Sequence, residues 1–452
     1  MIIEKIKKTT ETQVQKLLFY GFAVFLFLLP VPQLMYPWHD KAIAMQASIL
    51  MFVAIYFGFL LVIEALNKRV SFRMYGITWK CVTGLTIIGI ISVIFSEHKM
   101  ISLYGTRLRT EGLFTLVSYY VIFMAATVLQ EKKYRRMLLY LFLGLGCIVS
   151  VLGVIQFLGT EEISPYFTGM AYIPMRNPNF YGAFAVIFTG VAMGGYFISV
   201  KEAEIQYPLQ RWKRLLWYIL VILGYMACIS ASSSVTYVGI IMMLLLYLYL
   251  EMISKRRNLL SLLWLVLGLV GMMVLLNLLN DGLVFSEFFS VGRQIEEEGS
   301  IFGDGVGTGR MLIWKQTLSL LPRFWLFGCG IELLIGYCLE GSYNMDGLIF
   351  DRAHNEYLNL WITEGIFALV IYLVFLFALF LPGIAMFMKN KKTGEVRHVG
   401  DEVSKIALFA FFGYIAQAFF NISVVQVAPY FWMICGLLYS RKRIGNEETM
   451  DR

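Results

Sequence analysis

Long apolar segments dominate this sequence and constrain its fold more than any other feature. A helix needs about 20 residues to span a hydrocarbon core about 30 Å thick, and twelve segments meet that requirement within the error of their boundaries. They are residues 17–36, 43–64, 77–95, 112–129, 137–158, 180–199, 215–232, 235–250, 259–279, 365–388, 403–421 and 424–440. Only 15% of the residues are charged, against roughly 25% in soluble proteins. Because no alternating strand pattern is present, the sequence predicts an all-α polytopic membrane protein.

The apolar segments divide the chain into three parts. Residues 1–279 hold the first nine predicted membrane helices, residues 280–364 form a long polar interval, and residues 365–452 hold the last three helices and a C-terminal tail. The basic N-terminal stretch is followed by no small-residue cleavage site, so we interpret it as the start of a retained first helix.

Lys and Arg are distributed unevenly between the two sides of the predicted helices. Only ten of the 38 fall on the side that holds the 280–364 interval. These ten are Lys41, Lys99, Arg107, Arg109, Arg176, Arg293, Arg310, Lys315, Arg323 and Arg352. The positive-inside rule then predicts two cytoplasmic termini and an extracytoplasmic interval. The other basic residues form short clusters between apolar segments on the opposite side. Because this membrane-topology pattern accounts for the net charge of +8, we expect no nucleic-acid partner.

The outer interval contains a glycine run that leads into a helical pattern. Glycine recurs at every second position from Gly303 to Gly309, directly before Arg310. The run lacks the Lys-Ser/Thr end of a Walker loop and follows no strand, so a nucleotide site is not expected. From Met311 to Leu321 apolar residues recur at helical spacing, which predicts a helix lying flat on the membrane surface. An anionic ligand here would interact with Arg310 and with the helix N-terminus.

The interval closes with the run Arg352-Ala353-His354-Asn355-Glu356, which we interpret as the opening of the next membrane helix. A lone histidine at a helix start is more often a cap or a surface group than a catalyst. In this polar setting, however, a neutral His354 could accept a proton from a hydroxyl group. The sequence has no His-x-x-x-His, Cys-x-x-Cys or Gly-x-Ser-x-Gly motif, and we predict neither a metal nor another cofactor.

Two further outer turns carry arginines. Arg107 and Arg109 lie between the third and fourth predicted helices, and Arg176 lies directly before Asn177-Pro178-Asn179. The Asn-Pro-Asn run is typical of a turn that precedes a helix start. Insertion topology disfavours arginine on this side, so we expect these residues to have a local task. A disulfide between Cys329 and Cys338 is an open alternative if the interval faces an oxidising compartment.

Three spaced motifs resemble the O-antigen ligase and O-antigen polymerase superfamily. They are Gly309-Arg310 with Trp314, then Phe327-Gly328-Cys329-Gly330-Ile331, then His354-Asn355-Glu356-Tyr357-Leu358 followed by Glu364-Gly365-Ile366. The Asn-Pro-Asn helix start and the turn from Arg109 to Gly112 are similar to turns of that family. The motifs cover about the last third of the chain, and twelve helices with a large outer loop before the tenth also fit. In one departure, many members carry a Ser-Arg pair where this chain has Ser230-Ala231-Ser232-Ser233-Ser234.

The resemblance implies a membrane glycosyltransferase that inverts the configuration at the anomeric carbon and needs no metal, because its donor is already activated. The implied partners are an undecaprenyl-diphosphate-linked oligosaccharide donor, a glycan or glycolipid acceptor and the lipid bilayer of the cytoplasmic membrane. It also implies catalytic roles for His354, Arg310 and Arg176. Residues that would contact the substrate are Arg107, Arg109, Arg352, Asn355, Glu356, Asn177 and Asn179.

Alternatives to this interpretation stay open at the level of the sequence. A ligase and a polymerase differ only in the acceptor, and a protein O-oligosaccharyltransferase uses the same chemistry. A transporter or flippase of similar helix count commonly has charged residues near the membrane midplane, whereas Glu64, Glu251 and Glu364 lie at segment ends. A non-catalytic membrane subunit would leave the outer arginines unexplained.

Overall fold

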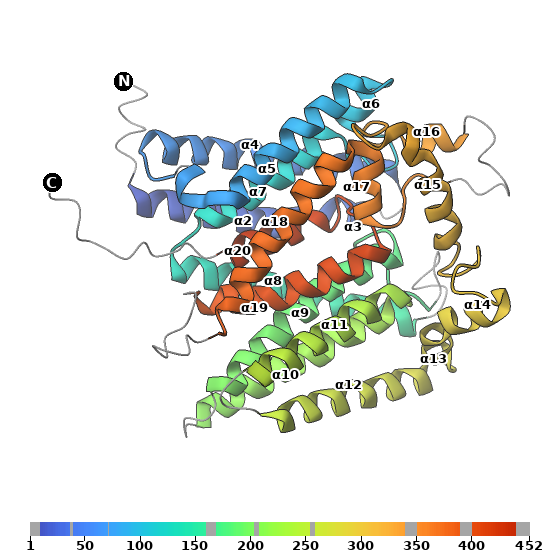
Figure 1. Cartoon of the computed structure of the whole chain (residues 1–452). Helices are drawn as coiled ribbons and strands as arrows, with labels where there is room; N and C mark the ends of the chain where they lie inside the picture. The colour runs from blue at the N-terminus through green and yellow to red at the C-terminus, as the bar shows by residue number, and fades with distance from the viewer. Residues whose placement is uncertain are drawn as a thin grey trace.

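The computed structural model describes residues 10–36, 39–70, 72–159, 169–202, 208–253, 258–339, 350–388 and 400–439. Every regular element within these ranges is a helix (Figure 1). The first are α2 (Glu11–Leu28), α3 (Val31–Met35), α4 (Asp40–Leu66), α5 (Phe72–Phe95), α6 (Lys99–Tyr104), α7 (Leu113–Val128), α8 (Lys132–Leu158), α9 (Pro178–Glu202), α10 (Pro208–Ser230), α11 (Ser234–Ile253) and α12 (Leu259–Leu279). They are followed by α13 (Leu283–Phe288), α14 (Ser290–Glu298), α15 (Arg310–Phe324), α16 (Leu334–Leu339), α17 (Glu356–Glu364), α18 (Ile366–Ala385), α19 (Glu402–Gln417), the 3-10 helix η1 (Ala418–Phe420) and α20 (Ala428–Leu438).

Helices occupy all twelve predicted apolar segments, which confirms the all-α polytopic fold. Among the described residues, ten helical spans are long and apolar enough to cross a membrane. The other two are shorter than predicted, since α7 has 16 residues and α20 has 11. The first predicted segment begins earlier, at Glu11, and α2 gives way to α3 near Pro30 and Pro32, because proline lacks the N–H that continues a helix.

The central helix of the bundle is α9. Every residue of its most apolar window is buried, and it packs against α8, α10, α11 and α19. A Cβ atom at Gly190 would lie 2.4 Å from Ala410 Cα, and one at Gly194 would lie 2.5 Å from the carbonyl oxygen of Ile406. Glycine therefore allows the close backbone approach that is typical of helix pairs in membranes. Because α9 begins at Pro178, its packing also fixes the turn before it at one end of the bundle.

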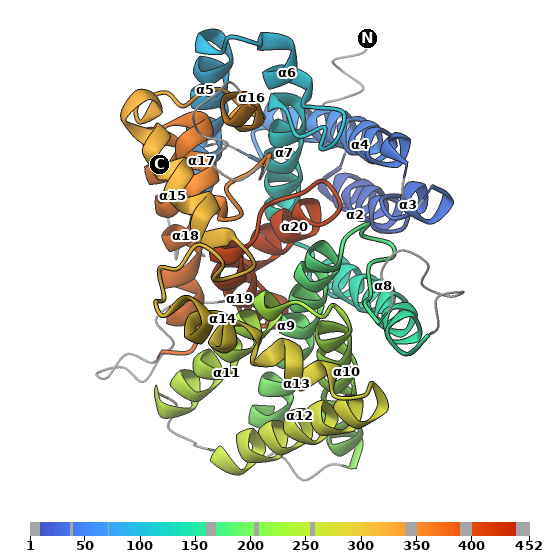
Figure 2. The same ribbon diagram turned by 90° about the vertical axis from the view of Figure 1, so that its right-hand side faces the viewer.

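The five helices between α12 and α18 form a layer at one end of the bundle, on the right in Figure 1. In the view onto this end, α15 lies beside α17 (Figure 2). The predicted helix from Met311 to Leu321 is confirmed within α15, and it buries Ile313 and Leu320 on one flank. Its position on a membrane surface stays a prediction.

The segment after His354 does not open the next membrane helix, so that interpretation of the sequence is wrong. α17 ends at Glu364 and α18 begins at Ile366, with Gly365 between them at φ 88°. A Cβ atom at Gly365 would lie 2.0 Å from the carbonyl oxygen of Leu326. Glycine is required here both for its left-handed backbone and for this contact, and α17 is consequently a separate short helix.

The glycine-rich motif before α16 holds α17 in place. Cys329 N donates to Ile362 O at 2.8 Å, and Gly330 N donates to Thr363 O at 3.0 Å. These hydrogen bonds satisfy two carbonyl groups in the last turn of α17. The open alternative of a disulfide between Cys329 and Cys338 is not tested, because the structure describes only the backbone of Cys338.

Candidate active site

The loop before α17 is anchored on both sides of His354. Asn355 caps the helix, because its Oδ1 accepts a hydrogen bond from Leu358 N at 3.0 Å. Asn359 Oδ1 accepts a hydrogen bond from Ala353 N at 3.2 Å. His354 lies between these two anchors with φ 48°, a left-handed conformation. The loop therefore presents the imidazole from a fixed backbone.

The imidazole of His354 is half-buried, and the charges of three arginines act on its pKa. Burial lowers its pKa, and the charge of Arg310 lowers that pKa further, to about 4. Asp351 acts in the opposite direction, while Arg109 and Arg352 add to the lowering. At pH 7 the imidazole is therefore neutral, the form that accepts a proton.

Arg310 is a partly buried cation at the first position of α15. Its Nη1 donates to the carbonyl oxygen of Gly307 at 3.0 Å and to Thr308 Oγ1 at 3.1 Å, while its Nε is buried and makes no hydrogen bond. Within the described part of the chain, no carboxylate lies at ion-pair distance from Arg310. Burial lowers the pKa of the guanidinium, and the more distant Glu287 opposes that effect. An anion would stabilise a partly buried cation that has an unused, buried donor atom.

Arg310 also lines an apolar groove of about 170 Å³. The groove is walled by Val235 and Val238 of α11 and by Met311 and Trp314 of α15, with further residues from α14 and η1. Apart from Arg310, none of the residues along the groove is charged. The groove therefore combines a cation with an apolar surface, as an amphipathic anion requires.

Arg109 and Arg176 line a second cavity, of about 200 Å³. Arg109 makes a bidentate ion pair with Asp351, with Nε–Oδ2 at 2.5 Å and Nη2–Oδ1 at 3.1 Å, and lies 5.4 Å from the ring centre of Phe180. Arg176 Nη2 donates to Asp40 Oδ1 at 2.9 Å. Each of these arginines already has an acidic partner, which distinguishes them from Arg310.

The two cavities are separate, and His354 is linked electrostatically to both. Arg310 does not line the cavity of Arg176, and Arg176 does not line the groove of Arg310. Arg109 and Asp351 belong to the second cavity, and their charges nevertheless act on the pKa of His354. Arg310 therefore lies in one cavity and Arg176 with Arg109 in another, and the charges of Arg310 and Arg109 both act on His354.

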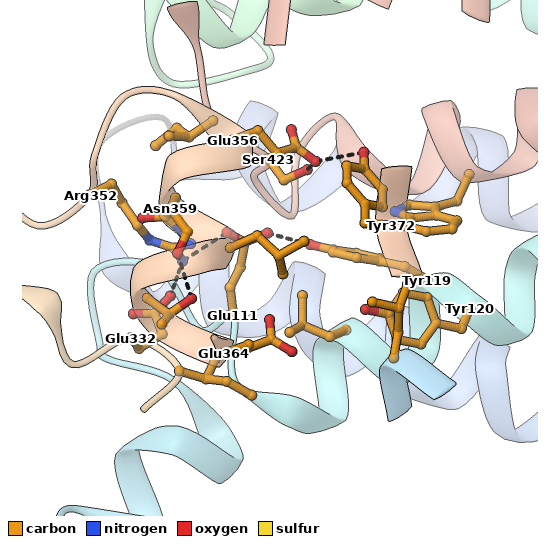
Figure 3. A pocket seen from close by; sticks show the side chains of 17 residues that line it. Glu111, Tyr119, Tyr120, Glu332, Arg352, Glu356, Asn359, Glu364, Tyr372 and Ser423 are labelled. Carbon is orange, nitrogen blue, oxygen red and sulfur yellow. Dashed lines mark hydrogen bonds and ion pairs between the residues drawn. The ribbon is translucent and has the colours of Figure 1, made fainter. Parts of the chain in front are cut away.

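Arg352 points into the protein interior (Figure 3). Its Nη2 donates to Glu111 Oε2 at 3.0 Å and also to Glu332 Oε1. Tyr119 OH donates to Glu111 Oε1 at 2.5 Å, and Thr106 Oγ1 donates to Glu332 Oε2 at 2.6 Å. The cluster joins the turn after α6 to the loop before α17. Arg352 is therefore an internal anchor, and its predicted contact with substrate stays a prediction.

Next to this cluster lies a cavity of about 60 Å³ that contains an unpartnered carboxyl group (Figure 3). Glu364 is 3% exposed, and its Oε2 has no hydrogen-bond partner among the described residues. Burial raises the pKa of Glu364 to about 8, although Arg352 opposes the change, and burial raises the pKa of Glu111 to about 7. The cluster therefore retains a proton at neutral pH.

Replacing Glu364 with Gln should remove a pH-dependent loss of stability. The pKa of Glu364 in the fold is above its ordinary value of 4.5, so its contribution to stability is complete below about pH 4.5. That contribution is lost as pH rises toward about 8, because the carboxyl group ionises in the unfolded chain while the fold keeps it protonated. We expect Glu364→Gln to melt within about 2 °C of wild type at pH 5 and several °C higher at pH 8.5.

The measurement is the apparent melting temperature of the purified protein across that pH range. Glu297→Gln, at an exposed position on α14, is the matched control and should follow wild type throughout. A Glu364→Gln curve parallel to wild type at every pH would contradict a proton held at this carboxyl group.

Three of the remaining predicted binding residues make hydrogen bonds within the protein, and the fourth is exposed. Glu356 Oε1 accepts a hydrogen bond from Tyr372 OH at 3.1 Å, so this carboxylate is engaged inside the protein. Asn177 Oδ1 accepts from Asn179 N at 2.9 Å, which forms the turn at the start of α9. Asn179 Oδ1 in turn accepts from a serine hydroxyl in the turn before α11. Arg107 is exposed.

Left-handed backbone is concentrated in the segments that build these cavities. Thr110, Arg176, Glu332 and His354 have φ values of 52°, 67°, 65° and 48°. Such conformations are unfavourable for residues with a side chain and tend to cluster at functional sites. This observation supports a functional site at this end of the bundle.

Four acidic residues were missing from the sequence-based site, which had included only Glu356 among the carboxylates. Asp40 and Asp351 compensate the outer arginines, and Glu111 and Glu332 hold Arg352. A signal was available, because Asp351 directly precedes Arg352 and Glu111 follows the Arg109 turn. The sequence gives no means of pairing these residues across such large separations.

The fold and the site together define a multi-pass membrane protein with a histidine and a partly buried arginine at one end of its helical bundle. The family model described as O-antigen ligase matches residues 205–373, from the region before α10 into α18. This match confirms the resemblance to the O-antigen ligase and polymerase superfamily, and it indicates a glycosyltransferase-like enzyme with lipid-linked glycan substrates. The matched region includes Arg310 and His354, whereas Arg109 and Arg176 lie before it. No curated protein matches the chain.

Proposed function

We propose that the protein transfers or polymerises an oligosaccharide from an undecaprenyl-diphosphate carrier on the outer face of the cytoplasmic membrane. The observation that carries the proposal is a half-buried imidazole, His354, whose pKa is lowered by the charge of Arg310, a cation that has no acidic partner in the described structure. The first group can accept a proton, and the second can stabilise a departing diphosphate. Glycosyl transfer from a lipid diphosphate requires both abilities.

The groove along α11 and α15 supports a lipid-linked donor. The isoprenoid chain would lie against Val235, Val238 and Met311, with its diphosphate at Arg310. A guanidinium about 4 Å from a phosphate oxygen contributes on the order of 4 kcal/mol at an effective dielectric constant near 20. The N-terminal amide groups of α15 would add to this attraction. We assign the donor to this groove for these reasons.

His354 then acts as the general base. It accepts the proton of an acceptor hydroxyl group while that oxygen forms a bond to the anomeric carbon of the donor sugar. The bond from this carbon to the diphosphate breaks at the same time, and undecaprenyl diphosphate leaves with the bonding electrons. Direct displacement inverts the configuration at the anomeric carbon. The activated donor and the cationic side chains provide for this reaction without a metal ion.

Arg109 and Arg176 are assigned to the neighbouring cavity, on the acceptor side of His354. Their pairing with Asp351 and Asp40 leaves that cavity close to neutral, which suits a sugar whose hydroxyl groups bind both arginine and carboxylate. The charge bias of the loops supports this face as extracytoplasmic and both termini as cytoplasmic.

The test is transfer by the purified protein in liposomes. Undecaprenyl-diphosphate-linked oligosaccharide would be supplied as the donor, with a lipid-linked glycan as the acceptor. We expect elongated or transferred glycan and release of undecaprenyl diphosphate, with no added nucleotide. Passage of intact donor between leaflets, with no new glycosidic bond, would overturn the proposal in favour of a flippase.

A further inference from the structure

We infer that the cavity between the N-terminal ends of α10 and α12 binds the head group of an anionic phospholipid. The cavity has a volume of about 410 Å³ and lies between Arg211 and Arg214 of α10 and Asn258, Ser261 and Trp264 at the start of α12. It is at the opposite end of the bundle from His354. The inference does not depend on the proposed function.

Two cations face this cavity without an acidic partner in the described structure. Arg211 and Arg214 lie one helical turn apart, so their side chains share a face of α10. The nearest basic neighbour, Lys213, is engaged with Glu402 at 3.3 Å. Glu251, at the end of α11, is buried in an ion pair with Lys201 at 2.7 Å. The cavity thus presents two arginines that form no ion pair with a described carboxylate.

The other walls of the cavity are held in fixed positions. Tyr218 OH donates to Trp264 O at 3.3 Å, and Tyr196 OH donates to Ser261 O at 3.2 Å. Asn258 Oδ1 accepts from Ser261 N at 3.2 Å and caps α12. These contacts bridge α9, α10 and α12, so the cavity is part of the packed structure. A preformed cationic site binds an anion with little loss of conformational entropy.

The surface beside the cavity favours a lipid over a free anion. Leu215 and Ile219 of α10 are 44% and 52% exposed, and Leu260 and Leu263 of α12 are 62% and 52% exposed. These apolar flanks continue along two helices that are long enough to cross a membrane, and acyl chains would cover them. Trp264, 60% exposed, is of the residue type enriched at the level of lipid head groups. Basic pockets between helices on the cytoplasmic side are typical sites for anionic lipids.

A lipid here would stabilise the candidate membrane span that is least buried in the protein. Only 22% of the apolar window of α12 is buried, the lowest share among the candidate membrane spans. α12 is followed directly by α13 and α14, and α14 contributes Val291 to the groove of Arg310. A lipid in the cavity would therefore stabilise the N-terminal end of α12 directly. Through α12 it would also stabilise the position of α13 and α14, which follow at the other end.

The test compares lipid binding by the full-length wild type and Arg211→Gln/Arg214→Gln, using native mass spectrometry with phosphatidylglycerol and phosphatidylcholine as probes. We expect wild type to retain phosphatidylglycerol over phosphatidylcholine, and the double variant to bind phosphatidylglycerol at least tenfold more weakly. Lys132→Gln/Lys133→Gln carries the same charge change at exposed positions on α8 and should behave as wild type. Equal phosphatidylglycerol affinity in wild type and the Arg211/Arg214 variant would overturn the inference.

Two further experiments complete the test. The first distinguishes a lipid head group from free phosphate as the bound anion, and the second uses wild type alone, so that it does not depend on the folding of a variant. Inorganic phosphate that displaces phosphatidylglycerol at millimolar concentration would overturn a lipid site in favour of a free-anion site. Photoactivatable phosphatidylglycerol, added to wild type alone, should label peptides from the first turns of α10 and α12. Labelling confined to other helices would overturn the inference without any substitution.

Discussion

His354→Ala should reduce glycan transfer by roughly 10²–10⁴-fold, the usual contribution of a general base. The imidazole is neutral at pH 7, because burial and Arg310 lower its pKa to about 4, so wild type has a proton acceptor available throughout the physiological range. The variant lacks that acceptor while the anchors of the loop, Asn355 and Asn359, are retained. The initial rate of transfer in liposomes measures the effect.

The matched control is His98→Ala, the same change at an exposed histidine before α6. It should leave the rate within about twofold of wild type. A His354→Ala rate equal to that of His98→Ala would remove His354 from the chemistry.

Arg310→Gln should reduce transfer by roughly 10²–10³-fold, the cost of removing one group that stabilises developing negative charge. Gln keeps a polar side chain at the first position of α15 and removes the cation that lacks an acidic partner. Arg323→Gln, near the other end of the same helix and 63% exposed, is the control and should retain nearly full activity.

A second readout separates an electrostatic role of Arg310 from a structural one. The positive charge of Arg310 lowers the pKa of His354, so its removal should raise that pKa toward the ordinary value of 6.5. The acid limb of the pH–rate profile should then move upward from about pH 4 in Arg310→Gln. An unchanged acid limb would show that the two residues do not act on one another.

The membrane fold follows from local patterns and was therefore accessible from the sequence. Apolar runs of sufficient length predicted every long helix, because the length of a span is set by the thickness of the bilayer. The spacing from Met311 to Leu321 predicted the helix of α15 for a similar reason, since it depends on neighbours three and four residues apart. Proline and glycine moved some boundaries, and Gly365 separated α17 from α18.

The site depended on contacts between distant parts of the chain and could be predicted only in part. His354 and Arg310 were identified from their motifs, and the structure brings them into one electrostatic environment. The pairing of Arg109 with Asp351 spans 242 residues, and that of Arg352 with Glu111 spans 241. No local pattern indicates which arginine is compensated and which is unpaired, yet this difference separates Arg310 from the other outer arginines.

The most direct test of the account is the equilibrium dissociation constant for undecaprenyl diphosphate, measured for wild type, Arg310→Gln and His354→Ala. If Arg310 holds the diphosphate and His354 acts on the acceptor hydroxyl, Arg310→Gln should bind at least tenfold more weakly than wild type. His354→Ala should bind within about threefold of wild type although it transfers almost nothing. Wild-type affinity in Arg310→Gln would contradict the central claim that this arginine and this histidine form one glycosyl-transfer site.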